Sequence, residues 1–515
     1  MFIENLKAEL NNEKQLTENG AVGYVTSGQK LLDLNFMVSS LRNAPEETIE
    51  KYFADAFYED PLLAIKWLFY GRDVRGGLGE RRLFRVCLRW LAVSRGDLVK
   101  ALIPLIQEYG RFDDLFSLFD DVKIGKYVMR CFGVILEKDY IKMRNGEPIS
   151  LAAKWAPRVN TSSKETKRLA KKLRNAMGYS ERAYRKLVSE MNRYIDTVEV
   201  KMSANEWSVI DYNNVPSRAN LIYKDAFMRH DESRRQDYLD SLSRGEAKIN
   251  AGALFPHDIV HKYTNGGWTL IKERIDTTIE ELWKNLPDYV NGANNVICVA
   301  DGSGSMCVNV GNTRVTALEV ANSLAIYFAE RSSGEFKDKY ITFSEKPRLV
   351  DFSRATSLNE KINIALAHNE IANTNIEAVF NLILNTAVKN KMKQKDLPKT
   401  ILILSDCEFD AMTDGDTSKA MFERFADKYR EHEYELPRLV FWNIDSRTKT
   451  VPIQQNKNGV ALVSGFSPAI VNMVLSNELD PYKCLLQEIN NDRYNPVEEA
   501  IQKYVEENGE KLRNL

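Results

Sequence analysis

Asp301, Ser303 and Ser305 stand at alternate positions in a short glycine-containing segment, Asp301-Gly-Ser-Gly-Ser305. A carboxylate and two hydroxyls at this spacing, with glycines that permit a tight turn, offer three hard oxygen ligands to one cation. Thr374 and Asp406 stand in two later segments and could complete the set. Five oxygen ligands, with water filling the remaining position, suit octahedral Mg²⁺ or Mn²⁺. The sequence therefore predicts a divalent-cation site.

The same region carries groups that could act in catalysis. Asp406, Glu408 and Asp410 alternate along the chain. Carboxylates beside a divalent ion are what a metal-dependent hydrolase requires, although such a site more often gathers carboxylates than hydroxyls. The serines do not form a G-x-S-x-G nucleophile elbow, and no histidine lies near them in the sequence. Cys307 and Cys407 flank the site, but buried, inert thiols are the commoner case. We therefore expect a non-enzymatic protein, with a metal-dependent hydrolase as the less favoured alternative.

The candidate ligands require strands that end beside one another. Residues 295–300 and 400–405 are short, mainly apolar runs. Asp301 directly follows the first run and Asp406 directly follows the second. Such runs are typical of strands buried on both faces of a parallel sheet. Because ligands of these sheets bind at the carboxyl ends of the strands, we expect the two carboxylates to share one edge of a sheet.

The periodicity of the apolar residues divides the chain into three regions. Residues 1–290 show helical spacing and no convincing strand, which predicts an all-α module of HEAT-like helical pairs. Residues 291–480 alternate apolar runs with helices, which predicts a doubly wound, mostly parallel α/β domain. Residues 481–515 are expected to form a helical tail packed on the body. Helices are expected near Ala420 to Glu431 and around Ala469 to Leu475 in the α/β region, and from Pro496 to Arg513 in the tail.

Residues 151–193 are strongly basic, with twelve lysines and arginines against three acidic residues. They contain a well-specified helix, in which Ser162 and Glu165 read as a capping box. Its cations recur at helical spacing on one face, and aromatic residues nearby could stack on bases. A solvated helix face is the commoner meaning of such a charge run. The candidates for RNA contact are Lys164, Lys167, Arg168, Lys171 and Lys172, with Trp155, Tyr179 and Tyr184 as stacking partners.

A second basic element is the glycine-rich turn of residues 71–82, Gly-Arg-Asp-Val-Arg-Gly-Gly-Leu-Gly-Glu-Arg-Arg. It is not a nucleotide-binding P-loop, because it lacks the Gly-Lys-Ser/Thr of that motif and follows a predicted helix rather than a strand. Its arginines could meet the phosphates of RNA, or Arg72 and Asp73 could lock neighbouring helices together. The candidates for phosphate contact are Arg72, Arg75, Arg81 and Arg82.

The composition of the 515-residue chain limits the class of protein. With 44% hydrophobic and 28% charged residues it is globular and long enough for two to four domains. The formal net charge of -1 gives no global attraction to nucleic acid or membrane, so any such attraction is local. The six cysteines form no CxxC pair and indicate neither a zinc module nor a disulfide scaffold. No run approaches about 18 apolar residues and the start does not read as a signal peptide, so we expect a cytoplasmic protein without a membrane partner.

The segment 301–305, the threonine at 374 and the aspartate at 406 resemble the metal-ion-dependent adhesion site of a von Willebrand factor A domain. The resemblance covers roughly residues 291–480. It implies that Asp301, Ser303 and Ser305 are direct ligands, and that Thr374 and Asp406 bind directly or through water. It also implies that a carboxylate of a protein partner takes the open coordination position.

A helical half ahead of such a domain is similar to the Ro ribonucleoprotein, whose TROVE module is a ring of HEAT-like repeats that holds single-stranded RNA ends. The match is closer to an uncharacterised Ro-like family. It is carried by Gly110-Arg-Phe-Asp-Asp-Leu115, Lys154-Trp-Ala-Pro157, Ser405-Asp-Cys-Glu-Phe-Asp410 and Phe441-Trp-Asn443.

Two functional hypotheses follow. The leading one is a non-enzymatic, Ro-like RNA-binding or ribonucleoprotein scaffold that also carries the divalent-metal adhesion site, with structured or single-stranded-ended RNA as its partner. The alternative is a metal-dependent adaptor that binds a protein carboxylate and no nucleic acid.

Overall fold

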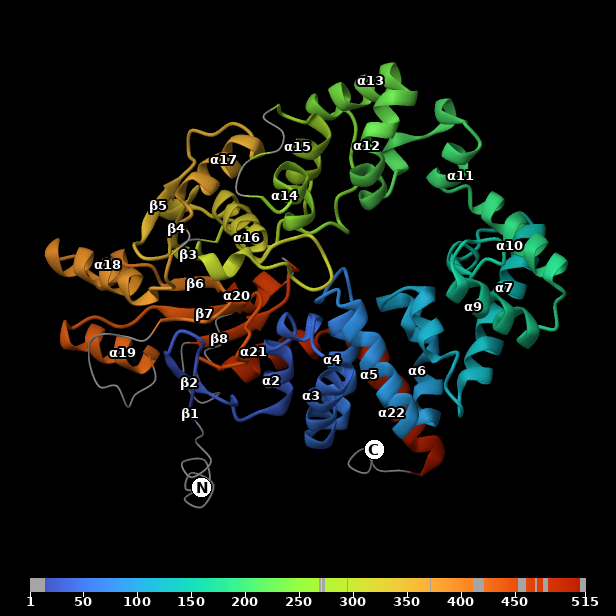
Figure 1. The fold of residues 1–515 in the computed structure, drawn as a ribbon, viewed down its shortest axis with the longest axis horizontal. Coiled ribbons are helices and arrows are strands. Elements are labelled where there is room, and N and C mark those ends of the chain that lie inside the picture. The colour runs from blue at the N-terminus through green and yellow to red at the C-terminus, as the bar shows by residue number, and fades with distance from the viewer. Residues whose placement is uncertain are drawn as a thin grey trace. The chain divides into compact units, whose positions relative to one another are not determined.

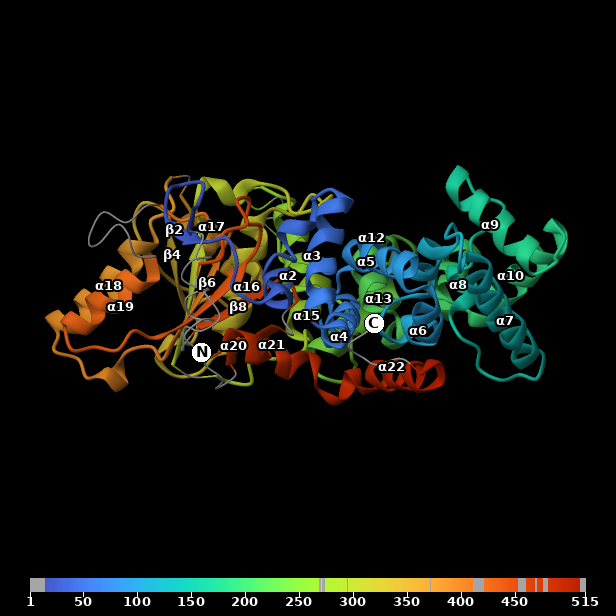
Figure 2. The ribbon, with the colours of Figure 1, turned by 90° about the horizontal axis from the view of Figure 1, so that it is seen from below.

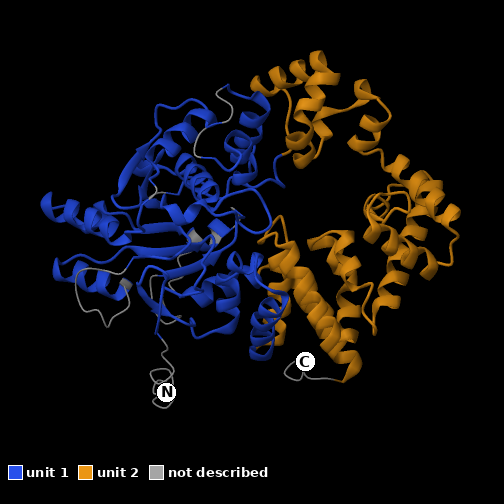
Figure 3. Ribbon diagram, in the orientation of Figure 1, with its two compact units in different colours: residues 1–59, 251–490 blue, residues 60–250, 491–515 orange. Residues whose placement is uncertain are grey.

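The computed structural model describes residues 14–267, 270, 274–293, 295–370, 372–410, 421–452, 460–467, 470–475 and 480–509. The chain forms two compact units, each built from two separate stretches of sequence (Figure 3). Unit 1 contains residues 1–59 and 251–490, and unit 2 contains residues 60–250 and 491–515. The coarse prediction of a helical module together with an α/β region is confirmed.

Unit 1 is built on a six-stranded sheet with the strand order β5-β4-β3-β6-β7-β8 (Figure 1). Neighbouring strands are parallel except for the antiparallel pair β4 and β5. Strands β3, β6 and β8 are buried throughout, as their apolar sequences predict. The strands are β3 (Val296–Asp301), β4 (Lys339–Phe343), β5 (Arg348–Asp351), β6 (Thr400–Ser405), β7 (Arg438–Asn443) and β8 (Val460–Ser464).

Helices from three parts of the sequence cover this sheet. Helix α16 packs over β3, β4 and β6, and α2, α20 and α21 pack against β8. The described helices of unit 1 are α2 (Lys30–Phe36), α3 (Glu46–Glu59), α14 (Pro256–Thr264), α15 (Thr277–Lys284), α16 (Ala317–Arg331), α17 (Leu358–His368), α18 (Ile376–Lys389), α19 (Met421–Glu431), α20 (Val471–Leu475) and α21 (Pro481–Ile489). Ala420 and Ala469, the expected starts of α19 and α20, lie outside the described residues.

The boundary expected near residue 290 falls inside unit 1, because residues on both sides of it pack on the sheet. Asn443 at the end of β7 donates a hydrogen bond to the carbonyl of Phe36 over 2.8 Å, and Ser464 at the end of β8 donates to the Ser39 hydroxyl over 3.0 Å. Helix α14 packs on α16. The apolar periodicity of a sequence indicates a helix but not the surface on which that helix packs. It therefore grouped the helices before residue 290 into one module, although several of them pack in unit 1.

A small hairpin before α2 corrects one expectation from the sequence. Strands β1 (Lys14–Leu16) and β2 (Val22–Tyr24) pair in antiparallel fashion, whereas we expected no strand before residue 290. Three-residue strands are too short to leave an alternating pattern in the sequence. Backbone hydrogen bonds of 2.8 Å in each direction between Tyr24 and Val451 fix the hairpin to the loop after β7.

Unit 2 contains helices and, within its described residues, no strand. Helix α4 packs on α5, α5 on α6, and α12 on α13. Its helices are α4 (Pro61–Arg72), α5 (Arg81–Ser94), α6 (Gly96–Tyr109), α7 (Gly125–Arg144), α8 (Ala152–Trp155), α9 (Lys164–Ala176), α10 (Glu181–Ile195), α11 (Val198–Ser203), α12 (Ser217–His230), α13 (Glu232–Ser243) and α22 (Asn495–Asn508). Unit 2 also contains the short 3₁₀ helix Phe112–Leu118, and unit 1 contains the short 3₁₀ helix Gly304–Cys307.

The predicted tail of residues 481–515 is divided between the units. Helix α21 belongs to unit 1, and α22 belongs to unit 2, where it lies beside α4 and α6 (Figure 2). Lys66 of α4, which is buried, pairs with Glu498 of α22 over 2.7 Å. Arg493 donates to Asp73 over 2.9 Å. The predicted continuation of this helix to Arg513 lies outside the described residues.

In the part of the chain that the structure describes, no helix combines the length and the apolar character needed to cross a membrane.

Candidate functional site

The carboxyl ends of β3 and β6 place two carboxylates side by side. The strands are parallel, with Ala300 opposite Leu404, so Asp301 at the end of β3 lies next to Ser405 at the end of β6. The Ser405 hydroxyl lies 2.6 Å from Asp301 Oδ2 and 3.5 Å from Asp406 Oδ1. This hydroxyl therefore bridges the two aspartates that the sequence predicted as ligands.

The loop after β3 directs both predicted serine hydroxyls to one place. The Ser303 backbone N–H donates to Asp301 Oδ1 over 2.9 Å, and the hydroxyls of Ser303 and Ser305 lie 2.9 Å apart. Gly302 is required here, because a Cβ at this position would lie 2.8 Å from the Thr342 hydroxyl and 2.9 Å from the Asn369 side-chain oxygen. The glycine lets the loop pass close to its neighbours, and the loop in turn orients the serines.

Thr374 is buried on the loop before α18 and is tied to the loop after β6. Its carbonyl accepts a hydrogen bond from the Asp410 N–H over 3.0 Å. Its hydroxyl accepts one from Asn19 over 3.4 Å, and the same Asn19 amide donates to the Glu408 carbonyl over 2.7 Å. The structure thus links Asp301, Ser303, Ser305 and Asp406 through hydrogen bonds, and connects Thr374 to the same loop through Asn19.

The two carboxylates are strongly perturbed by their surroundings. Burial, followed by repulsion from Asp406, raises the pKa of Asp301 to about 7. Burial also raises the pKa of Asp406, against opposing hydrogen bonds from the Glu408 N–H and Ser305 and the attraction of Arg447. Two buried carboxylates side by side are costly as anions unless a proton or a cation neutralises them. This arrangement, with hard oxygen donors around it, fits Mg²⁺ or Mn²⁺.

The residues of the site differ in their exposure to solvent. Asp301, Ser303, Thr374 and Asp406 are at most 1% exposed, whereas Ser305 is partly exposed. The Arg447 side chain is 37% exposed; its guanidinium lies 3.3 Å from Asp406 Oδ2 and 2.7 Å from Glu18 Oε2. A ligand would therefore approach past Ser305 and Arg447. Among the described residues no three His, Cys, Asp or Glu side chains gather as a metal site, and the candidate set itself has two carboxylates and three hydroxyls.

Glu408 is committed to structure. Its buried carboxylate accepts backbone hydrogen bonds from Glu18, Arg447 and Thr448 at 2.7–2.8 Å, and hydroxyl hydrogen bonds from Ser446 and Thr448. It therefore holds three loops together beside Asp406. Neighbouring Cys407 is buried, and burial raises the pKa of its thiol well above the ordinary value, which favours the inert thiol.

Sequence reasoning missed Ser405, Arg447 and Asn19 as parts of this site, and it considered Glu408 as a catalytic carboxylate rather than as the structural one that it is. Ser405 could have been found, since it stands next to Asp406 at the end of the predicted strand. Arg447 and Asn19 reach the site from distant segments, and nothing in their local sequence signals it.

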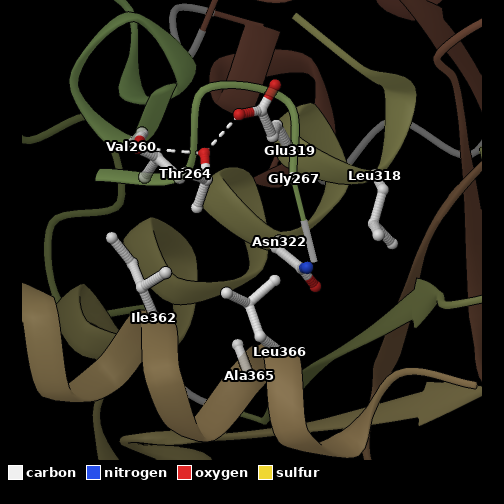
Figure 4. A pocket seen from close by; sticks show the side chains of 9 residues that line it. All are labelled: Val260, Thr264, Gly267, Leu318, Glu319, Asn322, Ile362, Ala365 and Leu366. Atoms are coloured by element: carbon white, nitrogen blue, oxygen red, sulfur yellow. Dashed lines mark hydrogen bonds between the residues drawn. The ribbon is translucent and has the colours of Figure 1, made fainter. Parts of the chain in front are cut away.

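A separate cavity lies between α14, α16 and α17 in unit 1 (Figure 4). Asn322 of α16 lines it, and neither polar atom of this buried side chain has a hydrogen-bond partner. Glu319 also lines it, but its carboxylate already accepts hydrogen bonds from Thr264, the Gly266 N–H and the Thr316 N–H. The remaining lining is mostly aliphatic: Val260, Leu318, Ile362, Ala365 and Leu366. We assign no function to this cavity.

The predicted basic face on α9 is partly neutralised by acidic residues. Both terminal nitrogens of Arg168 bond to Asp120 over 2.6–2.7 Å, and its Nε bonds to Glu165 over 2.8 Å. Lys172 also pairs with Asp120. Lys164, Lys167 and Lys171 are exposed, with no ion pair or hydrogen bond from their side chains to the described residues.

Two details of this region differ from the sequence interpretation. The helix is capped by Ser163, whose hydroxyl accepts from the Thr166 N–H over 3.2 Å, so the assignment of the cap to Ser162 is wrong by one residue. Tyr184 is buried and donates to the Pro157 carbonyl over 2.8 Å, so it does not present a stacking surface. Tyr179 is half-buried, and Trp155 lies under the Arg111 guanidinium, 3.9 Å from the ring centre.

Arg72 in the glycine-rich turn locks helices together. Its guanidinium is buried and bonds through Nε to Asp114 over 2.8 Å, as the alternative interpretation of this turn required. It is therefore not placed to contact phosphate. Arg75, Arg81 and Arg82 are exposed.

Comparison with known proteins finds relatives without an assigned function. Residues 295–508 match a domain of unknown function, DUF7788, and residues 17–95 and 160–293 match another, DUF2828. An uncharacterized protein of Acanthamoeba polyphaga mimivirus is 29% identical over 520 residues, covering 93% of this chain and 88% of the viral protein. The similarity thus extends over both units.

Proposed function

We propose that unit 1 is a von Willebrand A-like domain that binds Mg²⁺ or Mn²⁺ and uses it to capture a carboxylate of a protein partner. The observation that carries the proposal is the convergence of Asp301, Asp406, Ser303 and Ser305 at adjacent strand ends, with Ser405 bridging the aspartates. The resemblance of residues 301–305, 374 and 406 to an adhesion site supports the same conclusion.

The protein's own groups have distinct parts in this function. Ser405 and the Ser303 N–H hold the Asp301 carboxylate from two sides. Ser305 is partly exposed, unlike Asp301, Ser303, Thr374 and Asp406, and is the predicted ligand that a partner would reach first. The Arg447 guanidinium, also partly exposed, is paired with Asp406 and Glu18 and helps to hold Asp406 in place. A bound cation would supply the remaining positive charge and an open coordination position for the partner's carboxylate oxygen.

A peptide-capture experiment tests this function. The full chain is passed over two immobilised peptide pools that differ only in one central residue, Asp or Glu in one pool and Asn or Gln in the other. We expect retention on the acidic pool in Mg²⁺, release by a chelator and no retention of the Asp301→Ala variant. Equal retention on both pools, or retention that survives the chelator, would contradict the proposal. Asp351→Ala, which changes an exposed aspartate on β5, is the control.

RNA binding by unit 2 is a second candidate, favoured by one observation. Lys164, Lys167 and Lys171 present three exposed cations along α9, and the turn before α5 adds exposed arginines. Phosphate contacts of this kind give affinity that falls steeply with salt. In this proposal unit 2 is a HEAT-like module of a Ro-like ribonucleoprotein scaffold, and the metal centre has a separate partner.

The RNA hypothesis predicts a salt-dependent interaction with structured RNAs that have single-stranded ends. Replacing Lys164, Lys167 and Lys171 by Glu should abolish it. The control replaces exposed Lys337, Lys389 and Lys395 of unit 1 by Glu, which changes the net charge equally. Equal binding by the two triple variants would exclude α9 as the RNA surface.

A further inference from the structure

Three motifs far apart in the sequence meet in unit 2. The glycine-rich turn at residues 71–82, the segment Gly110–Leu115 and the segment Lys154–Pro157 supply three arginines, two aspartates and a tryptophan, and Arg85 of α5 joins them as a fourth arginine. The proposed metal centre uses none of these residues.

Two aspartates hold three of the arginines in place. Asp114, which is fully buried, accepts from Arg72 Nε over 2.8 Å and from Arg85 Nε over 2.7 Å. Asp113 accepts from Arg85 Nη2 over 2.9 Å and from two nitrogens of Arg111 over 2.6 and 2.8 Å. The Arg111 guanidinium also stacks on Trp155. These contacts fix the guanidinium planes and leave little side-chain entropy to lose on binding.

The glycine-rich turn positions the fourth arginine. Leu78 N–H, Gly79 N–H and Glu80 N–H donate to carbonyls of Tyr70, Asp73 and Gly71 over 2.7–3.1 Å, which folds the turn back on the end of α4. A Cβ at Gly77 would lie 2.0 Å from the Tyr70 carbonyl oxygen, so the glycine permits this close approach. Helix α5 then begins at Arg81, beside the cluster.

Arg81 has no hydrogen bond or ion pair from its side chain to any described residue, and it is exposed. Arg81 lies one helical turn before Arg85 on α5, so the two side chains share a face of the helix. Although the residue as a whole is exposed, partial burial of its guanidinium, with repulsion from Arg111, Arg72 and Arg85 and opposed by Asp113, lowers the pKa of this group to about 10. The four guanidinium groups thus lie with the carboxylates of Asp113 and Asp114, and a third buried carboxylate, that of Glu80, immediately precedes Arg81. The positive end of the α5 dipole also lies here, and the N-cap residue, Glu80, makes no side-chain capping hydrogen bond.

We propose that this cluster, defined as Arg81, Arg85 and Arg111 on the buried Arg72–Asp114 pair, is a binding site for a phosphate group. Arg81 donates to the phosphate oxygens, and the outer edges of Arg85 and Arg111 complete the site. Planar guanidinium groups in fixed orientations match the oxygens of a phosphate group. The phosphate is either a free or small-molecule phosphate or part of an RNA backbone, and the site does not depend on the metal centre.

Titration of the full chain with inorganic phosphate, a nucleoside monophosphate and a single-stranded oligoribonucleotide tests the proposal. Arg81→Ala is the test variant, because loss of an unpartnered side chain leaves the fold intact. Arg185→Ala removes another exposed arginine of unit 2, on α10, and is the matched control. We expect Arg81→Ala to weaken at least one of the three ligands tenfold or more, and Arg185→Ala to change each by less than twofold.

The pattern of losses identifies the source of the phosphate. A loss for inorganic phosphate or the mononucleotide indicates a small-molecule site, and a loss for the oligoribonucleotide alone indicates a contact to an RNA backbone. If wild type binds none of the three, or if Arg81→Ala and Arg185→Ala behave alike with all of them, the proposal is overturned. The control for folding is the midpoint temperature of thermal unfolding, which should be close to the wild-type value for both variants.

Discussion

At the scale of single residues, the Ser405 hydroxyl determines the geometry of the candidate metal centre. It touches both Asp301 and Asp406, and it lies between strand-end groups that repel each other as anions. Ser405 is not itself one of the predicted ligands. It acts by fixing the orientation of the Asp301 carboxylate, as outer partners of metal ligands generally do.

Ser405→Ala should therefore weaken divalent-cation binding by about 10–100-fold while leaving the stoichiometry at one ion per chain. The measurement is a Mn²⁺ titration followed by electron paramagnetic resonance. Ser405→Thr, which keeps the hydroxyl, should recover most of the affinity. Unchanged affinity in Ser405→Ala would show that the bridging hydroxyl has no part in the site.

Arg72 shows a buried charge with a structural task. It is 2% exposed and paired with Asp114, which is 0% exposed. Removing one partner of a buried pair leaves the other uncompensated, so Arg72→Ala should lower the free energy of unfolding by about 3–5 kcal/mol. Arg185→Ala, at an exposed position, should change it by less than about 0.5 kcal/mol. Urea denaturation measures both, and a small effect of Arg72→Ala would mean that Arg85 alone satisfies Asp114.

At the scale of elements, the start of α16 is fixed by a carboxylate that joins two helices. Glu319 accepts a hydrogen bond from the Thr264 hydroxyl of α14 (Figure 4). It also forms a capping box with Thr316 and lies 3.0 Å from His261 Nδ1 of α14. Burial would raise the pKa of Glu319, but its hydrogen bonds from His261, Thr264 and two backbone N–H groups outweigh this and lower it. The ionised form is the one that stabilises the fold.

A lowered pKa in the folded state sets the sign of the pH dependence. The stabilisation from Glu319 is present above its unfolded value of 4.5 and is lost as the pH falls through the lower folded value. Glu319→Gln should thus cost about 1–3 kcal/mol at pH 7. The difference between wild type and variant should shrink below about pH 4.5, as followed by urea denaturation at several pH values. A difference independent of pH would show that the charge does not matter.

The elements also explain what the sequence could predict and what it could not. Apolar runs ending at Asp301 and Asp406 predicted parallel strands, and the carboxyl ends of parallel strands meet, so this half of the site was accessible to sequence reasoning. The helix spacing of Lys164 to Lys172 likewise predicted a basic face. Asp120, which neutralises two of those cations, comes from a segment some fifty residues earlier. Such pairing depends on tertiary packing, which local periodicity does not encode.

At the scale of the whole molecule, each unit is assembled from segments distant in sequence, and residues 491–515 pack on the helices of unit 2. Tyr494 stacks on Tyr109 with ring centres 5.6 Å apart and bonds to Asp73 over 3.2 Å, while Glu498 pairs with the buried Lys66. The C-terminal segment is thus part of the core of unit 2.

Deleting residues 491–515 should destabilise unit 2 selectively. Without residues 491–515, Lys66 loses Glu498 and Asp73 loses Arg493 and Tyr494. Apolar surface on α4 and α6 also becomes exposed, so amides of these helices should exchange much faster. Amides of β3 and β6 in unit 1 should keep their protection. Hydrogen exchange measured by mass spectrometry distinguishes the two regions, and unchanged protection of α4 and α6 would contradict this description of unit 2.

The central claim is that Asp301 and its neighbours hold a divalent cation, and isothermal titration of the full chain with Mg²⁺ and Mn²⁺ tests it most directly. We predict one ion per chain for wild type and for Asp351→Ala, whose substitution lies on β5 opposite the start of β4. Removing an outer partner of a metal site typically weakens metal binding by about 10–100-fold. Asp301 is a proposed ligand, so Asp301→Ala should weaken binding by at least as much. Binding by Asp301→Ala equal to that of Asp351→Ala, or no binding by wild type, would contradict the assignment.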